Sequence, residues 1–96
     1  MAKAEISWER ELEDGSNLQC YAHHHGRDWL FYKRRKRNDV WQAVPKPPLE
    51  DWLALLDAVR RSIPRRRWMP KDEAHLLKLI HEQYPEADPG EPQFPV

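Results

Sequence analysis

The chain has 96 residues, of which 40% are hydrophobic and 33% are charged, and its formal net charge at pH 7 is zero. This length suits one small domain with a modest core, and the five Trp, three Tyr and two Phe exclude a wholly disordered chain, because large aromatic side chains carry much of a small core's burial energy. No apolar run approaches the roughly 20 residues of a membrane-spanning helix, so we expect no membrane association. A lone cysteine, Cys20, and the lack of an apolar signal segment lead us to expect a cytoplasmic protein.

The zero net charge conceals three blocks of opposite sign. Residues 1–32 carry three Lys or Arg against six Asp or Glu, residues 33–71 carry twelve against four, and residues 72–96 carry one against six. The blocks therefore have net charges of −3, +8 and −5. Such segregation indicates steering toward a charged partner rather than any particular fold.

The first half of the sequence alternates between apolar and polar residues, which is the period of antiparallel strands with one solvated face. Asp14-Gly15 and His25-Gly26 are turn signals between the alternating runs. A short apolar segment that ends at Val44 follows the last run. We predict a β-meander of three to four antiparallel strands at about residues 4–12, 17–24, 28–34 and 40–44.

The second half changes to the helical period of 3.6 residues. Pro48 and Pro70 suit the first positions of two helices, and acidic residues follow each of them. Pro64 and Pro85 end these segments, because proline interrupts a helix. We predict helices at about residues 48–62 and 70–84.

Strands followed by helices predict an α+β fold in which the two helices pack on one face of the antiparallel sheet. We expect residues 1–84 to form a single small domain. Residues 85–96 hold four prolines and three acidic residues, a composition that indicates a flexible, acidic, Pro-rich tail.

Ten of the sixteen basic residues stand in two short segments, one at the predicted hairpin tip and one at the interhelical turn. Like charges packed together repel, and a phosphate or another anion would relieve that repulsion. The alternative is a solvated turn and a helix end, neutralised by the acidic residues of the strands and the tail. The candidate anion-binding residues are Lys33, Arg34, Arg35, Lys36, Arg37, Arg60, Arg61, Arg65, Arg66 and Arg67.

Aromatic residues accompany both basic segments. Tyr32 and Trp41 flank the first and Trp68 follows the second, so these three are candidates for stacking on bases. An exposed aromatic row beside cations is how a sheet holds single-stranded nucleic acid. The run at residues 29–32 is apolar throughout, however, so its two faces stay ambiguous, and a strand covered on both sides is the alternative.

Histidines at 23 and 25 are the candidate metal ligands, because alternate residues of a strand point to the same side. They lack a third ligand at a recognisable spacing, so we predict no metal site and no cofactor. Cys20 lies within strand alternation as a core residue, and the sequence holds no nucleophile motif. We therefore expect no enzymatic activity.

These observations favour a small non-enzymatic binding module that docks on an anionic partner, with nucleic acid first among the candidates, through the basic hairpin tip and the interhelical turn. The alternative is a protein-interaction adaptor or inhibitor that uses the segregated charge and the C-terminal tail, where Phe94 would be an anchor. The sequence leaves open whether the partner is RNA or DNA and whether the two basic segments form one patch.

Overall fold

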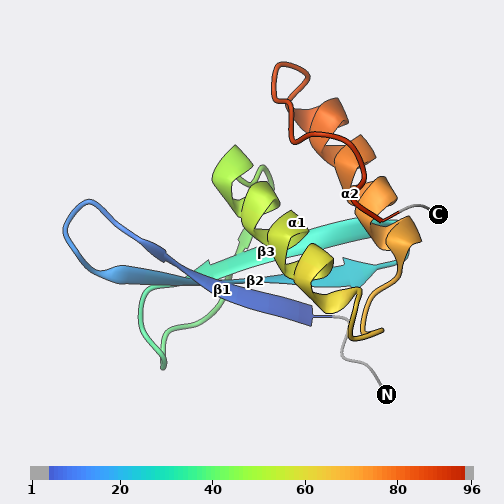
Figure 1. Ribbon diagram of the computed structural model, residues 1–96. Coiled ribbons are helices and arrows are strands. Elements are labelled where there is room, and N and C mark those ends of the chain that lie inside the picture. Colours follow the sequence, from blue (N-terminus) through green and yellow to red (C-terminus); the bar gives the residue numbers. More distant parts are fainter. Residues whose placement is uncertain (1–4, 95–96) are drawn as a thin grey trace. The chain divides into compact units, whose positions relative to one another are not determined.

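The computed structural model describes residues 5–94, so residue 4 of the predicted first strand and residues 95 and 96 of the predicted tail lie outside it. A four-stranded antiparallel sheet is followed by two helices, which confirms the predicted α+β class (Figure 1). The chain divides into two compact units, residues 1–47 with the sheet and residues 48–96 with the helices. Neither helix of the described part is long and apolar enough to cross a membrane. A single domain over residues 1–84, with helices against one sheet face, stays a prediction.

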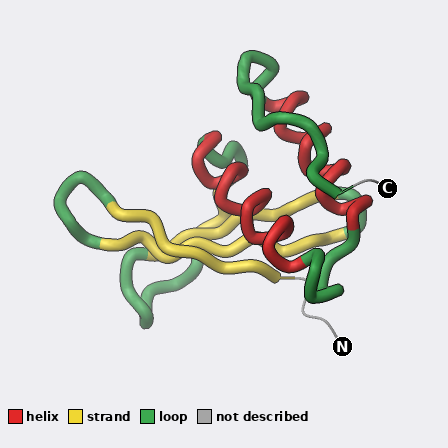
Figure 2. The backbone as a smooth tube through the Cα atoms, viewed as in Figure 1, coloured by secondary structure: helices red, strands yellow, loops and turns green. Residues whose placement is uncertain are grey.

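The sheet is a meander of four strands in the order β1-β2-β3-β4, as predicted. Its strands are β1 (Glu5–Glu11), β2 (Asn17–His25), β3 (Asp28–Arg34) and β4 (Gln42–Val44). Figure 2 shows the strands in yellow and the connecting turns in green. Strand β4 is shorter than predicted because Val40, which is 83% exposed, and Trp41 belong to the preceding turn.

Glycine makes two of the strand connections possible. Gly15, between β1 and β2, has a φ of +87°, and Gly26, between β2 and β3, has a φ of +61°. Residues with a side chain rarely adopt such positive angles. Gly26 is the first residue of a two-residue loop that joins His25 to Asp28, a position where tight hairpins favour glycine.

The strand register assigns every side chain to one of two faces. The core face carries the buried residues, with Cys20 opposite Trp8 and Ala22 opposite Phe31. The second face carries Tyr21 opposite Tyr32 and His23 opposite Leu30, which is 42% exposed. The register thus resolves the ambiguous run at residues 29–32, because Trp29 and Phe31 are buried while Leu30 and Tyr32 lie on the second face.

The helical unit holds α1 (Leu49–Ser62) and α2 (Pro70–Gln83). In α1 the buried residues include Trp52, Leu55, Leu56 and Val59, which follow the i, i+3, i+4, i+7 spacing of one helical face. Leu55, near the centre of this face, is fully buried, whereas Leu53 lies outside the face and is 39% exposed.

A buried carboxylate, that of Glu73 in α2, joins both helices to the tail. Its Oε2 accepts a hydrogen bond from Arg60 Nε at 2.6 Å, and its oxygens accept the backbone N–H groups of Gln93 at 3.0 Å and Phe94 at 3.1 Å. Arg60 Nη2 also donates to the Glu91 carbonyl at 3.3 Å. The tail, predicted to be flexible from residue 85 onward, is thus hydrogen-bonded to the helices at its far end.

Several opposing effects act on the Glu73 carboxyl group. Burial by itself raises the pKa of Glu73, because a carboxylate loses hydration inside the protein. The hydrogen bonds from Arg60, Gln93 and Phe94 outweigh burial and hold the pKa below its ordinary value of 4.5. Glu73 is therefore a charged residue near neutral pH despite its position inside the unit.

Candidate anion-binding site

The first basic segment, which we call the basic turn (residues 33–37), begins in β3 and runs into the connection to β4. The connection is closed by two hydrogen bonds, from Asp39 N to the Lys36 carbonyl at 3.0 Å and from Lys36 N to Asp39 Oδ2 at 3.2 Å. Lys33 and Arg34 are strand residues, and successive strand residues point to opposite faces. The basic turn therefore supplies cations to both faces of the sheet.

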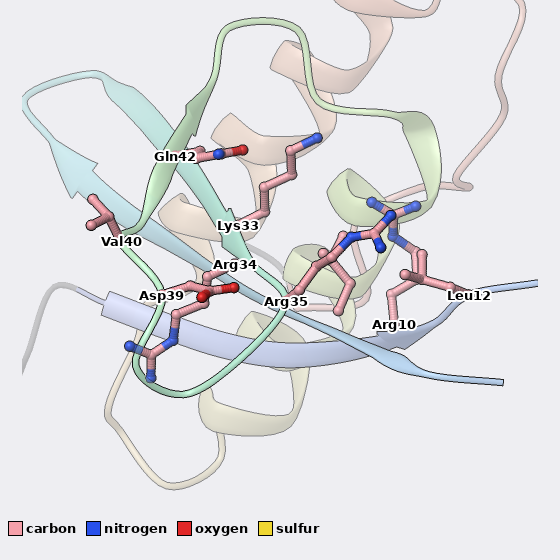
Figure 3. A pocket seen from close by; sticks show the side chains of 9 residues that line it. Arg10, Leu12, Lys33, Arg34, Arg35, Asp39, Val40 and Gln42 are labelled. Atoms are coloured by element: carbon pink, nitrogen blue, oxygen red, sulfur yellow. The ribbon is translucent and has the colours of Figure 1, made fainter. Parts of the chain in front are cut away.

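A pocket of about 710 Å³ lies on the core face beside the basic turn. Four of the residues around it are cationic: Arg10 from β1, Lys33 and Arg34 from β3, and Arg35 from the turn (Figure 3). Figure 3 shows that the Arg10 and Lys33 side chains extend to one side of the sheet while that of Arg34 extends to the other. Strand β1 and the basic turn, which are far apart in sequence, thus contribute positive charge to one concavity.

The remaining walls of the pocket are mixed in character. Leu12, Leu18 and Val40 give it an apolar surface, and Gln42 adds an amide. Asp39 is the single acidic residue among those that line it. Because the Arg34 side chain extends to the other face (Figure 3), Arg10, Lys33 and Arg35 are the cations that face this pocket against one carboxylate. An anion in the pocket would gain favourable electrostatic energy.

On the second face, aromatic side chains gather next to the basic turn. The rings of Tyr21 and Tyr32 stack with centroids 4.7 Å apart, and Trp41 meets Tyr21 edge-on at 4.6 Å. The Arg34 guanidinium lies 4.2 Å from the centre of the Trp41 ring, and Arg34 Nε donates to Gln19 Oε1 at 2.7 Å. Two of the three predicted stacking residues, Tyr32 and Trp41, therefore lie in one cluster with a cation.

The environment of this cluster changes the pKa of Tyr21. Burial raises the pKa of the Tyr21 phenol above its ordinary value of 10.0, and the nearby Tyr32 and Glu5 add to the effect. Both contributions disfavour the negatively charged phenolate. The Tyr21 phenol thus stays neutral over the physiological range and offers uncharged ring surface.

The second face is acidic at its other edge. Glu5, Glu9 and Glu11 of β1 lie opposite His23, Gln19 and Asn17, so their side chains share this face. These carboxylates repel phosphate groups. An anionic ligand on this face would therefore meet less repulsion beside β3, β4 and the basic turn.

The second basic segment belongs to the helical unit, whereas the basic turn belongs to the unit that holds the sheet. Arg60 binds Glu73, as described above, and Arg61 Nε pairs with Asp57 Oδ2 at 2.9 Å one helical turn earlier. The other three cations, Arg65, Arg66 and Arg67, are exposed in the turn between α1 and α2. Trp68 follows them and is half-buried. The exposed arginines of the turn are thus better placed to meet a ligand than the two helical ones.

The histidine run divides between the two faces. His23 and His25 share the second face with ring centroids 6.3 Å apart, and His23 Nδ1 lies 3.6 Å from Glu5 Oε1. His24 instead stacks on Trp29 at 4.7 Å. Over residues 5–94, no group of three or more His, Cys, Asp or Glu side chains is placed to hold a metal ion.

Arg10 is the site residue that the sequence analysis missed. Its position in β1 belongs to the set that carries Ile6 and Trp8 on the core face. An arginine at such a position breaks the apolar alternation, and that break was the available signal.

Comparisons of the chain with protein-family models, with curated proteins and with solved structures find no match.

Proposed function

We propose that this protein is a non-enzymatic binding module that docks on single-stranded nucleic acid through the basic turn and the aromatic cluster of the second face. One observation carries the proposal. The Arg34 guanidinium, 4.2 Å over Trp41, joins the aromatic rings to the row of exposed cations that begins at Arg35. Stacking surface and positive charge are thus continuous at one end of the sheet.

Each part of this surface matches one part of a nucleotide. Every base has a flat face that stacks on an aromatic ring, and each such contact is worth about 1–3 kcal/mol. The cations of the basic turn would contact the phosphates and release their condensed counterions. A duplex keeps its base faces inside its own stack, so the surface favours a single strand.

The exposed arginines at residues 65–67 and Trp68 offer a second contact of the same kind in the helical unit. A strand long enough to reach both contacts gains affinity by linkage, because the second contact forms at a high effective concentration. Arg60 and Arg61 contribute less in this proposal, since Glu73 and Asp57 already neutralise them.

The proposal is tested by measuring the affinity for a mixed-sequence single strand at several salt concentrations. We expect binding at ~50 mM salt and a log–log salt slope of several units, about 0.7 for each phosphate neutralised. Reversing Arg35, Lys36 and Arg37 together to Glu should abolish binding or lower the slope by about 2. Tyr32→Ala should weaken binding with little change of slope, because it removes stacking and leaves the charge.

A matched control separates a site-specific loss of affinity from a loss caused by the change of net charge alone. Arg65, Arg66 and Arg67 reversed to Glu give the same change of net charge in the other unit. If the two triple variants lose affinity equally for a strand too short to span both contacts, the basic turn is no specific site. Absence of binding by the unaltered chain at low salt would refute the proposal and favour a protein partner.

A further inference from the structure

The pocket on the core face is not explained by a strand that tracks along the second face. Arg10 and Lys33 project from the core face, as their strand register with Leu18 and Gln42 shows. The aromatic cluster of Tyr21, Tyr32 and Trp41 involves the other face. A ligand in the pocket therefore meets a different set of groups from the bases of a bound strand.

The charge of the pocket suits a phosphate monoester better than an internal phosphodiester. An internal phosphodiester carries one negative charge, whereas a phosphate monoester carries about −1.5 to −2 near neutral pH and presents three acceptor oxygens. Arg10, Lys33 and Arg35 are the cations on this side of the sheet (Figure 3), and Asp39 is the one carboxylate among the lining residues. Arginine presents a planar fork of donors that can bind two phosphate oxygens at once, and both Arg10 and Arg35 line the pocket.

The size and the remaining walls of the pocket indicate what the phosphate is attached to. A volume of about 710 Å³ lies within the range of roughly 300–1,000 Å³ that holds small organic ligands, and it is far larger than a phosphate needs. Leu12, Leu18 and Val40 would contact an apolar or flat ring, and the Gln42 amide can both donate and accept a hydrogen bond. These properties fit the ring and edge of a nucleobase.

We infer that this pocket binds a nucleotide through a terminal phosphate monoester. Arg10, Lys33 and Arg35 hold the phosphate, and the leucines and Gln42 receive the base. The same chemistry has two sources, a free nucleoside monophosphate and the phosphorylated end of a strand. Only the second source rests on the proposed function.

Calorimetric titration of the full chain with a nucleoside 5′-monophosphate tests the inference. The unphosphorylated nucleoside and inorganic phosphate serve as comparison ligands. We expect the monophosphate to bind at least about tenfold more tightly than either, because it alone fills both parts of the pocket. Equal affinity for the nucleoside and the monophosphate would overturn the inference.

Arg10→Gln and Arg35→Gln should each lower this affinity by about tenfold or more, since each removes a charge-assisted hydrogen bond. Arg27→Gln is the matched control, because it removes the same charge from the loop between β2 and β3. Arg35 is exposed, so its substitution leaves the fold intact and keeps the test valid if Arg10→Gln unfolds the chain. An equal loss from Arg27→Gln would show general charge attraction and overturn the inference.

Strands of one sequence with a 5′-phosphate, a 3′-phosphate or hydroxyl ends separate the two sources. Tighter binding of an end-phosphorylated strand, lost in Arg35→Gln and kept in Arg27→Gln, supports the strand end as ligand. Binding of the free monophosphate with equal affinity for all strands supports the free nucleotide. If the free monophosphate does not bind and an end phosphate does not change strand affinity, the inference is refuted. The proposed function is tested separately: it still holds if strand binding depends on salt and is weakened by Tyr32→Ala.

Discussion

Glu73→Gln is the substitution that we expect to destabilise the helical unit most for its size. Glutamine has nearly the same shape as glutamate, so the change removes the negative charge and one acceptor without opening a cavity. Glu73 is 0% exposed, and the side chain of its partner Arg60 is 16% exposed. The variant leaves the Arg60 guanidinium mostly buried without its counter-charge.

The size of the effect follows from these contacts. Removing one partner of a buried ion pair costs about 3–5 kcal/mol, and the partial exposure of Arg60 brings the value toward the lower end. The backbone N–H groups of Gln93 and Phe94 lose their charged acceptor as well, which adds to the loss. We therefore expect the free energy of unfolding to fall by about 3 kcal/mol, a large share of the ~5–15 kcal/mol typical of a domain.

The effect should depend on pH in a defined direction. The pKa of Glu73 is lowered in the folded protein relative to its ordinary value of 4.5, so the folded state holds the charged form more strongly than the unfolded state does. This contribution to stability is complete above pH 4.5 and is lost as the pH falls through the lowered folded-state pKa. The difference between the unaltered chain and Glu73→Gln should shrink over the same interval.

Urea denaturation, followed by far-ultraviolet circular dichroism at several pH values, measures this difference. Glu82→Gln is the control, because Glu82 is an exposed glutamate of the same helix. A second variant, Arg60→Met with Glu73→Gln, should recover part of the stability, since it removes both charges and keeps an oxygen acceptor for the backbone N–H groups of Gln93 and Phe94. Equal stability of Glu73→Gln and Glu82→Gln near neutral pH, or a difference that does not change with acidification, would refute this account of the buried carboxylate.

Two further predictions concern backbone conformation and the aromatic cluster. Gly26→Ala should lower the free energy of unfolding by about 1 kcal/mol, because φ is +61° at this position. Arg66→Gly, at φ +60°, should raise the free energy of unfolding or leave it unchanged in the same urea titration. A change of the same sign in both variants would contradict the assigned turns. Tyr21 should ionise above pH 10.0, and Tyr32→Phe should bring its pKa down toward that value in an absorbance titration of the phenolate. Because this pKa is raised, the associated stability is present below pH 10.0 and is lost as the pH rises through the folded-state value. A Tyr21 that titrates at its ordinary value would show that the cluster opens in solution.

Local patterns in the sequence were sufficient for the elements and their order. Three kinds of local signal predicted them: the alternation in β1 and β2, the two glycine turns, and the prolines that begin α2 and follow both helices. Each signal acts on residues that are near neighbours in the chain, so it can be recognised without knowledge of the fold. The strand register needed more than local pattern. All four residues at 29–32 are apolar, and only pairing with β2 decides that Phe31 is buried opposite Ala22 while Tyr32 stacks on Tyr21.

Composition and periodicity indicate an α+β chain with two basic segments, the first between Tyr32 and Trp41 and the second followed by Trp68. Long-range packing selects which of those residues meet. It brought Arg10, separated by 22 residues from Lys33 in the sequence, into one pocket with the basic turn, and it paired Arg60 with Glu73 inside the helical unit. Both results depend on contacts between residues far apart in the chain, and a pattern of neighbours carries no information about such contacts.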